Sequence, residues 1–401
     1  MNRELGKIPE VFLAKLLKAK LKEGGYRASN KLACSFASHL LKNPELPFHW
    51  GRKNEPETVI EITDEEFASL TSEIEKFCEN DLPDIIIRVQ DKLAGDILNS
   101  LKEDWPCQKA FEGHVRDGFK DRLEEDWGTA FDSIRLMLVI SRESGNEFIK
   151  WISRSQKRRT SAKYDCLLKL HARGCQVTTE IMCLMENGLA DGAFARWRTL
   201  HEIAVVTTIL ADSDDELAQR YLDHESIDAK RSMDYFKLNY QALGYEKPDA
   251  AEIERIEAEY LVTLARYGNA FGSQYGWIAP HLGLKKATFL DLEKAVGQIS
   301  TRSYYLFAGY NVHAAARGIN FRLGLIEQNG TILSGMSNVG FFEPANNTAH
   351  SLARLNICLM EGRWNLDQLV TAKILLELRN SVAELFHKAQ SEVETRHEIR
   401  S

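Results

Sequence analysis

A long stretch without proline constrains the fold of this chain more than any other feature. The sequence contains only nine prolines, and none lies between Pro106 and Pro248. Within this stretch apolar residues recur at steps of three and four, which is the repeat of one face of an α-helix. Proline interrupts helices because it lacks a backbone N–H and fixes φ. The stretch therefore predicts successive helices, and we expect an all-α protein built as a multi-helix bundle.

The helices are expected to form two domains. A chain of 401 residues is long enough for two or three packed cores. Residues 153–163 are polar and basic and contain no large apolar residue, which indicates a connection between domains. We therefore expect an N-terminal helical domain over 1–152, which binds a partner or regulates, and a C-terminal helical domain over 164–401, which carries the candidate site. Within the first domain, residues 63–66 (Thr-Asp-Glu-Glu) have the pattern of a capping box that begins a helix.

Two Asn-Gly pairs mark breaks between the predicted elements. Asn187-Gly188 follows one helical repeat and precedes another, which predicts the end of the first helix and the start of the second. Asn329-Gly330 separates two short apolar runs, which is the pattern of a hairpin turn. We therefore expect one small β-hairpin near 323–342, before the last two helices.

Charge and cysteine use narrow the classes of function. The formal net charge is −7, so the whole molecule offers no broad cationic surface for nucleic acid, although it leaves room for a local basic patch. Seven cysteines are scattered and never form a C-x-x-C pair, so we expect no disulfide framework, no metal site and no cofactor. No apolar run approaches the ~20 residues that span a bilayer, and the N-terminus lacks a secretory pattern. We therefore expect a cytoplasmic protein without membrane contact.

A first polar cluster lies on the helix predicted over 190–211. Arg198 and Glu202 are four residues apart, so they share a face, and that face continues into apolar residues. A partly buried Arg–Glu pair is costly unless its hydrogen bonds are complete. The pair is either an internal ion pair that fixes the helix, or an arginine poised to bind a phosphate or carboxylate. His201, beside the pair, is either structural or a general base, since imidazole titrates near neutral pH.

A second polar cluster lies on the helix predicted over 288–317. Tyr305 is eight residues before His313 and Arg317 is four residues after it, so the three lie near one face. Such a stripe can bind an anionic or hydroxyl-bearing ligand, although aromatic stripes more often serve packing. Further candidates to complete a pocket between the clusters are Tyr221 and Lys230 on the intervening helix, and Tyr275-Gly276-Trp277 on a loop.

Arg196 and His201 have an Arg-x4-His spacing, which resembles the motif of the HEPN superfamily (higher eukaryotes and prokaryotes nucleotide-binding). Its nuclease members are helical, metal-independent ribonucleases. In such enzymes Arg would stabilise the phosphate and His would handle the 2'-hydroxyl proton. About two such spacings are expected by chance in a chain of this composition, and this one lies mid-chain instead of at the start of a last helix. The spacing alone therefore does not predict a nuclease.

A wider resemblance covers about 160–320. The pattern of Arg-Ser/Thr-Leu-x-Glu on one helix and of Tyr followed by Val-His on another is similar to that of a bacterial family of helical proteins of unknown function, with expected links to defence or stress loci. In this chain the pattern falls on Arg198, Glu202, Tyr305 and His313. Where such families often have Ser before the Val-His, this chain has Gly-Tyr-Asn. The resemblance implies where a site lies and leaves its chemistry open.

The leading hypothesis from the sequence is a HEPN-like effector that processes nucleic acid, as a metal-independent endoribonuclease with RNA as its partner. His313 or His201 would act as acid and base. Arg198 or Arg317 would hold the anion, with Arg196 as a further binding residue.

The alternatives are a non-enzymatic regulatory or scaffold protein, which binds another protein through its N-terminal domain, and a sensor of a small anionic ligand. A Leu-rich C-terminal helix also suits a homodimer. The hypotheses differ in one geometric expectation. The enzyme needs Arg198 and Glu202 to meet Tyr305 and His313 where solvent can reach them.

Overall fold

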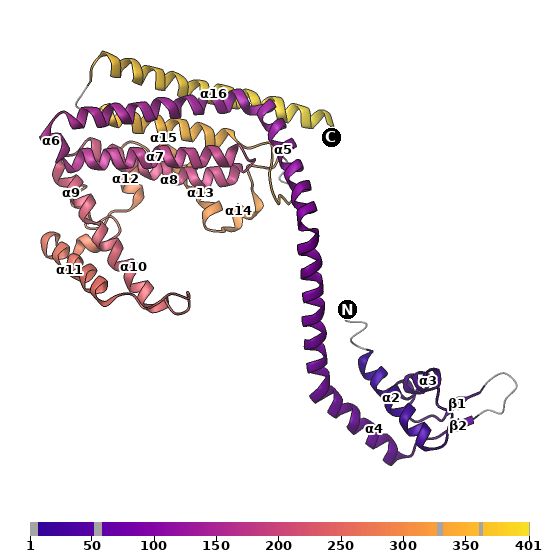
Figure 1. The fold of residues 1–401 in the computed structure, drawn as a ribbon. Coiled ribbons are helices and arrows are strands. Elements are labelled where there is room, and N and C mark those ends of the chain that lie inside the picture. Colours follow the sequence, from indigo (N-terminus) through magenta and orange to yellow (C-terminus); the bar gives the residue numbers. More distant parts are fainter. Residues whose placement is uncertain (1–6, 52–57, 327–331, 361–363, 401) are drawn as a thin grey trace. The chain divides into compact units, whose positions relative to one another are not determined.

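The computed structural model describes residues 7–51, 58–326, 332–360 and 364–400. Apart from one two-stranded antiparallel hairpin its regular elements are helices, so the all-α class is confirmed (Figure 1). The chain divides into two compact units, Met1–Gly113 and His114–Ser401. No helix within the described ranges is both long enough and apolar enough to cross a membrane.

The first unit has a small apolar core. Its elements are α2 (Ile8–Glu23), α3 (Asn30–Lys42), β1 (Phe48–Trp50), β2 (Thr58–Ile60), α4 (Asp64–Lys76), η1 (Phe77–Asp81) and the first turns of α5. The predicted capping box begins α4: the Thr63 hydroxyl accepts from the backbone N–H of Glu66, and the Glu66 carboxylate accepts from that of Thr63. In the hairpin Phe48 lies opposite Ile60, and both side chains are buried.

Helix α5 (Leu82–Ser153) belongs to both units, so the unit boundary differs from the expected one at residues 153–163. The boundary falls after Gly113, within the helix. Two observations explain the difference. Pro106 lies inside α5 and does not end it, and the later turns of α5 bury Trp127 and Phe131 in the core of the second unit.

The basic segment at residues 153–163 forms a tight connection inside the second unit. It contains the short helix α6 (Gln156–Arg159). The Arg158 guanidinium lies 4.0 Å from the centre of the Trp151 ring and donates to the Trp151 carbonyl at 2.9 Å. Ser161 then caps the next helix by accepting from the N–H of Tyr164. At least one basic side chain of this segment, that of Arg158, therefore stabilises the turn between α5 and α7.

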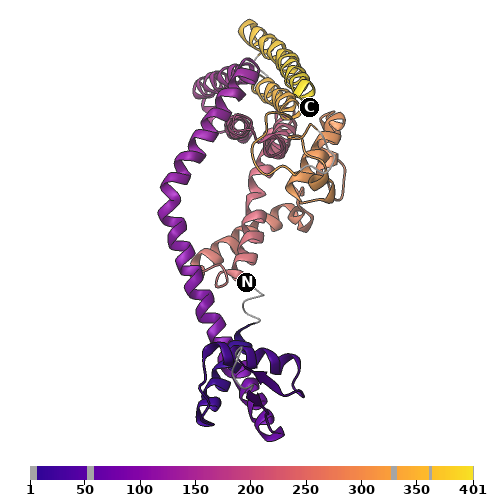
Figure 2. The same ribbon diagram turned by 90° about the vertical axis from the view of Figure 1, so that its right-hand side faces the viewer.

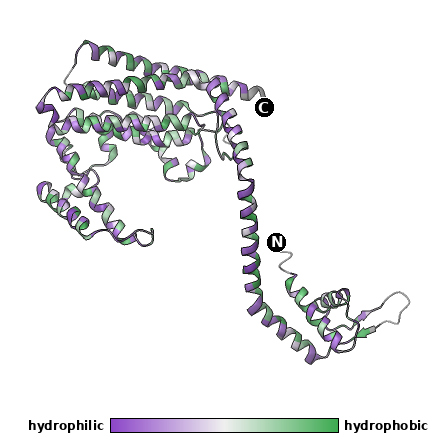
Figure 3. Ribbon diagram, viewed as in Figure 1, coloured by the Kyte–Doolittle hydropathy of each residue, from purple (hydrophilic) through white to green (hydrophobic). Residues whose placement is uncertain are grey.

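The second unit is a bundle of long helices. The later part of α5 lies beside α7 (Ala162–Met185), α8 (Ala190–Ala211), α15 (Phe342–Met360) and α16 (Leu366–Arg400), which run across the view of Figure 1 and are in part seen nearly end-on in Figure 2. Hydrophobic and hydrophilic residues alternate along these helices (Figure 3), as expected where each helix buries one face. Trp127 packs edge-on against Phe341, and Phe131 packs against Phe386. Aromatic side chains of distant segments thus meet in one core.

Shorter elements cover one side of this bundle: α9 (Asp215–Asp223), α10 (Glu225–Asn239), α11 (Ala250–Tyr267), η2 (Asn269–Gly272), α12 (Phe289–Ala295), η3 (Ile299–Thr301), α13 (Arg302–Val312) and α14 (Ala316–Asn320). Helix α13 packs directly on α8. The predicted break before α8 is confirmed, since α7 ends at Met185 and Gly188 has a φ of 75°. Helix α13 thus lies against α8, the helix that carries Arg198 and Glu202.

The β-hairpin expected near 323–342 is not formed by its described residues. Residues 323–326 and 332–341 contain no strand, and the expected turn at Asn329-Gly330 lies outside the described residues. The polar groups of this segment bond to other parts of the unit instead. The N–H of Leu323 donates to the Asp191 carboxylate, and the N–H of Ser337 donates to the carbonyl of Gly188. The observed hairpin instead pairs Phe48–Trp50 with Thr58–Ile60 in the first unit.

Candidate functional site

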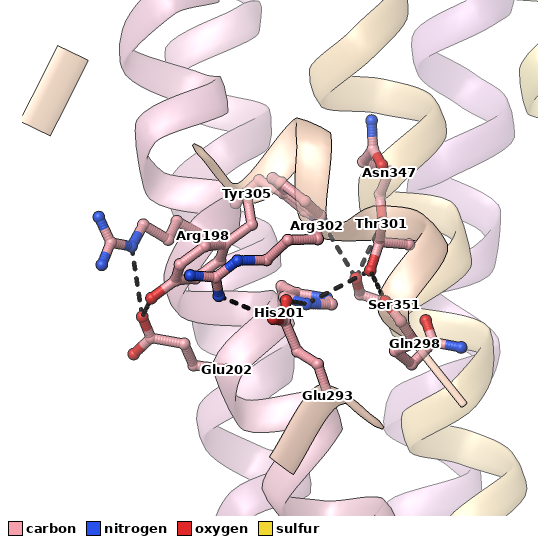
Figure 4. Close-up of polar contacts among 11 residues, drawn as sticks. Arg198, His201, Glu202, Glu293, Gln298, Thr301, Arg302, Tyr305, Asn347 and Ser351 are labelled. Atoms are coloured by element: carbon pink, nitrogen blue, oxygen red, sulfur yellow. Dashed lines mark hydrogen bonds and ion pairs between the residues drawn. The ribbon is translucent and has the colours of Figure 1, made fainter. Parts of the chain in front are cut away.

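Helices α8 and α13 bring the two predicted clusters together (Figure 4). Arg198 and Glu202 lie one turn apart on α8, and Arg198 Nε donates to Glu202 Oε1 at 3.3 Å. The Tyr305 hydroxyl of α13 donates to the same oxygen at 2.6 Å. The Arg198 guanidinium also lies 4.3 Å from the centre of the Tyr305 ring. One carboxylate and one aromatic ring thus hold Arg198 in place.

His313 completes the cluster. It is the first residue after α13, and Arg198 Nη1 lies 3.0 Å from its Nε2. A guanidinium can only donate, so Nε2 accepts and the neutral ring carries its proton on Nδ1. The next residue, Ala314, has a φ of 49°, an uncommon conformation for a residue with a Cβ, and it turns the chain at this point. His313 is exposed and the Arg198 side chain is 24% exposed, so solvent reaches the pair. We name Arg198, Glu202, Tyr305 and His313 the α8–α13 cluster.

Two features of α13 fit the cluster closely. A Cβ at Gly309 would lie 3.1 Å from Arg198 Nη1, so a larger residue there would push the guanidinium aside. Burial and the hydrogen bond to Glu202 raise the pKa of Tyr305, and its hydroxyl therefore stays protonated as a donor. Nearby Tyr275, on the loop after η2, is within range of the charges of Glu202 and Arg198, and burial is the main cause that raises its pKa.

His201 does not join this cluster, although it precedes Glu202 in the sequence. It is 3% exposed, and its Nε2 lies 3.0 Å from Glu293 Oε1 on α12. Glu293 is fully buried and also accepts from Arg302 Nη1 at 2.7 Å (Figure 4). Burial lowers the pKa of His201 despite this carboxylate, so the ring is neutral and donates. We name His201, Glu293 and Arg302 the buried triad; it lies beneath the site and positions its helices.

The Arg-x4-His pair points in two directions. Arg196 faces α7, where it bonds to Glu180, and its Nη1 donates to Thr199 at 3.2 Å. It lines a cavity of about 980 Å³ between α5, α7 and α8. His201 faces α12. Residues five apart on a helix lie on different faces, so this pair does not form the HEPN-like arrangement.

The remaining predicted ligand-binding residues lie elsewhere. The prediction that Arg317 shares a helix face with Tyr305 and His313 is wrong, because α13 ends at Val312 and Arg317 lies on the separate helix α14. Its guanidinium lies 5.6 Å from the centre of the Phe307 ring. Tyr221 packs edge-on against Trp277, and burial raises its pKa to about 12. Lys230 makes ion pairs with Asp234 and Glu257 and so links α10 to α11. None of these contacts joins them to the α8–α13 cluster. Within the described ranges, no three His, Cys, Asp or Glu side chains gather as a metal site.

A known protein family matches part of the second unit. Residues 164–332 match the model of a family of unknown function (DUF5677). The match includes the α8–α13 cluster and the buried triad, and it spans less than half of the chain. No curated protein and no solved structure matches the chain. The resemblance to a family of unknown function is thus confirmed for this segment, and it brings no activity with it.

Within the matched segment, Asp191 is a residue that the sequence analysis missed. It lies in the first turn of α8 and is buried. Its carboxylate accepts from Arg322 Nε at 3.0 Å and from the N–H of Leu323 at 2.9 Å, with Asn311 Nδ2 at 3.4 Å. In the sequence Asp191 looks like any acidic residue at the N-terminus of a helix, where such residues are common. Only the fold shows that it holds the chain on both sides of His313.

Replacing Asp191 with Ala is expected to lower the free energy of unfolding by about 2–4 kcal/mol, because Arg322 and a backbone N–H lose a buried acceptor. Urea denaturation followed by circular dichroism measures the change. Asp165→Ala is the matched control: Asp165 lies in the first turn of α7 and pairs with Lys169 at the surface. Its cost should stay below about 1 kcal/mol, and equal losses for both variants would contradict the assigned role.

The buried histidines predict how stability depends on pH. Burial is the main cause that lowers the pKa of both His171 and His201. Below about pH 6.5 the unfolded chain therefore binds protons that the folded chain does not, so the free energy of unfolding falls with decreasing pH, by up to about 1.4 kcal/mol per pH unit for each histidine. Urea denaturation between about pH 7.5 and about pH 5.5 tests this pH dependence, because ordinary carboxylates titrate below this interval. His171→Gln should reduce the slope, and a flat profile for the wild type would refute the prediction.

Proposed function

We propose that the α8–α13 cluster is the active site of a metal-independent endoribonuclease. The observation that carries the proposal is the 3.0 Å contact between Arg198 Nη1 and His313 Nε2 at a surface that solvent reaches. A guanidinium binds phosphate oxygens through two parallel donors, and an imidazole transfers protons near neutral pH. These are the two tasks that RNA cleavage at a phosphodiester requires. A role in a bacterial defence or stress system is part of the same proposal. It rests on the resemblance of residues 160–320 and not on the HEPN spacing, because Arg196 and His201 lie on different faces of α8.

The cleavage step uses the contacts already present. When an RNA phosphate binds, Arg198 transfers its hydrogen bond from His313 to the phosphate oxygens, which frees the lone pair of Nε2. His313 Nε2 then takes the proton of the 2'-hydroxyl while the 2'-oxygen bonds to phosphorus. The bond from phosphorus to the 5'-oxygen breaks, and the leaving oxygen takes a proton from water. The products are a 2',3'-cyclic phosphate and a 5'-hydroxyl, and His313 returns its proton to solvent.

Glu202 and Tyr305 have positioning roles in this proposal. Glu202 accepts from both Arg198 and Tyr305, so it fixes the guanidinium over α13. The Tyr305 ring supports the guanidinium from below, and its hydroxyl stays protonated. The net charge of −7 means that RNA has to be attracted locally. Arg302 is paired with Glu293, so the added positive charge beside α13 comes from Arg317 of α14, whose guanidinium lies 5.6 Å from the centre of the Phe307 ring.

The test is incubation of the protein with total RNA and with a synthetic single-stranded RNA, both with and without EDTA. A DNA oligonucleotide of the same sequence is the matched control, because it lacks the 2'-hydroxyl. We expect cleavage of RNA alone, unaffected by EDTA, with 2',3'-cyclic phosphate ends. Equal cleavage by the wild type, His313→Ala and Arg198→Ala, or cleavage by none of them, would reject the nuclease.

A further inference from the structure

A second pocket lies where the end of α8 meets α15 and α16. Its volume is about 320 Å³, at the lower end of pockets that bind small molecules. The polar and charged residues that line it include Asp212, Gln298, Thr301, His350, Arg354 and Arg379. None of them belongs to the α8–α13 cluster. The pocket is therefore a separate place where this unit can hold a ligand.

Arg354 is the unusual residue of this pocket. It is partly buried, and among the described residues its one hydrogen bond runs to the carbonyl of Val296 at 3.5 Å. Burial lowers the pKa of its guanidinium, and the charge of Asp212, which makes no ion pair with it, offsets this only in part. Several other partly buried arginines of the unit each reach a carboxylate: Arg135 with Glu186, Arg196 with Glu180, Arg302 with Glu293, and Arg322 with Asp191. Arg354 therefore has unused donors inside a pocket.

Two further basic groups face the same space. The partly buried Arg379 of α16 donates to the neutral amide of Asn380. His350 lies at the exposed rim, where partial desolvation together with the charges of Arg379 and Arg354 lowers its pKa. Among the described residues that line the pocket, Asp212 is the only carboxylate, and it is exposed. Positive charge thus exceeds negative charge inside a partly enclosed space.

We propose that this pocket binds a small molecule with a phosphate group, held by the guanidinium groups of Arg354 and Arg379. Two guanidinium groups match the double negative charge of a phosphate monoester better than that of a single carboxylate. Gln298 and Thr301 supply neutral donors and acceptors to the rest of the ligand. A small ligand fits the volume, whereas a nucleic-acid strand needs an extended groove. This proposal does not depend on the ribonuclease proposal.

Binding is tested by titrating the protein with inorganic phosphate and with pyrophosphate in a calorimeter, with thermal unfolding in parallel and with chloride at equal ionic strength as the reference. We expect saturable binding and a rise in Tm with either phosphate probe but not with chloride. Arg354→Met and Arg379→Met should each weaken binding by at least about tenfold, because each removes charged hydrogen bonds to the anion. Absence of saturable phosphate binding by the wild type would overturn the proposal.

Folding of the variants provides a second readout. Arg354 has no carboxylate partner among the described residues, so Arg354→Met should unfold without ligand at the same Tm as the wild type or higher. Lys373→Met is the matched control, since Lys373 is an exposed cation on α16 that pairs with Glu377. It should bind phosphate as the wild type does. Equal binding by Arg354→Met and wild type, or equal loss in Lys373→Met and Arg354→Met, would show that phosphate does not use this pocket.

Discussion

Replacing His313 with Ala is expected to slow RNA cleavage by about 10²- to 10⁴-fold, which is the usual contribution of a positioned acid–base group. In the proposed mechanism His313 Nε2, next to the phosphate clamp Arg198, takes the proton of the 2'-hydroxyl. The side chain is exposed at the end of α13, so its loss should change the free energy of unfolding by less than about 0.5 kcal/mol. Single-turnover cleavage of a fluorescent RNA, together with urea denaturation, measures both effects.

The control for this variant is His281→Ala. His281 is an exposed histidine of the same unit that has no part in the α8–α13 cluster, so cleavage should continue at the wild-type rate. Arg198→Ala should also lose cleavage, since the phosphate loses its charged donors. A His313→Ala variant that is folded and cleaves RNA at the wild-type rate would exclude His313 as the base.

Replacing Glu293 with Gln is expected to lower the free energy of unfolding by about 3–5 kcal/mol, as found when one partner of a buried ion pair is removed. Glu293 is fully buried, and its two oxygens serve His201 at 3.0 Å and Arg302 at 2.7 Å. Gln keeps the size but removes the negative charge, and its NH2 group takes the place of one of the two accepting oxygens, so the donor of one partner loses its acceptor. Urea denaturation followed by circular dichroism measures the loss.

Glu252→Gln is the matched control for this substitution. Glu252 lies on the surface of α11, where its carboxylate accepts from Arg255 at 2.7 Å. An exposed ion pair contributes little, so the expected loss is much smaller than that of Glu293→Gln. If Glu293→Gln were as stable as Glu252→Gln, the buried triad would not hold α8, α12 and α13 together.

Local signals in the sequence predicted several helix boundaries. The Thr63 hydroxyl and the Glu66 carboxylate form their capping box within four residues, so no distant contact is needed. Gly188 can adopt its positive φ because it lacks a Cβ, and it ends α7 for that local reason. The boundary between the two units was expected at residues 153–163, but it falls inside α5. No break in the helix marks it, since α5 continues even through Pro106.

The candidate site was predictable only in part. Arg198 and Glu202 share a face because they are four residues apart, and this follows from helix geometry alone. The partners of His201 and Asp191 were not predictable, since Glu293 and Arg322 lie far along the chain from them. The sequence around His201 and Asp191 does not distinguish them from an ordinary histidine or acidic residue on a helix.

The sequence by itself determined the all-α class, and it placed Arg198 and Glu202 one turn apart on the same helix. The reason is that helical repeats, caps and i,i+4 neighbours depend on contacts within a few residues. The helix of Tyr305 ends at Val312, just before His313. Only the tertiary structure decided that α13 packs on α8, so that Arg198 reaches His313 while His201 turns inward to Glu293. That choice depends on which faces are buried together, which no local pattern specifies.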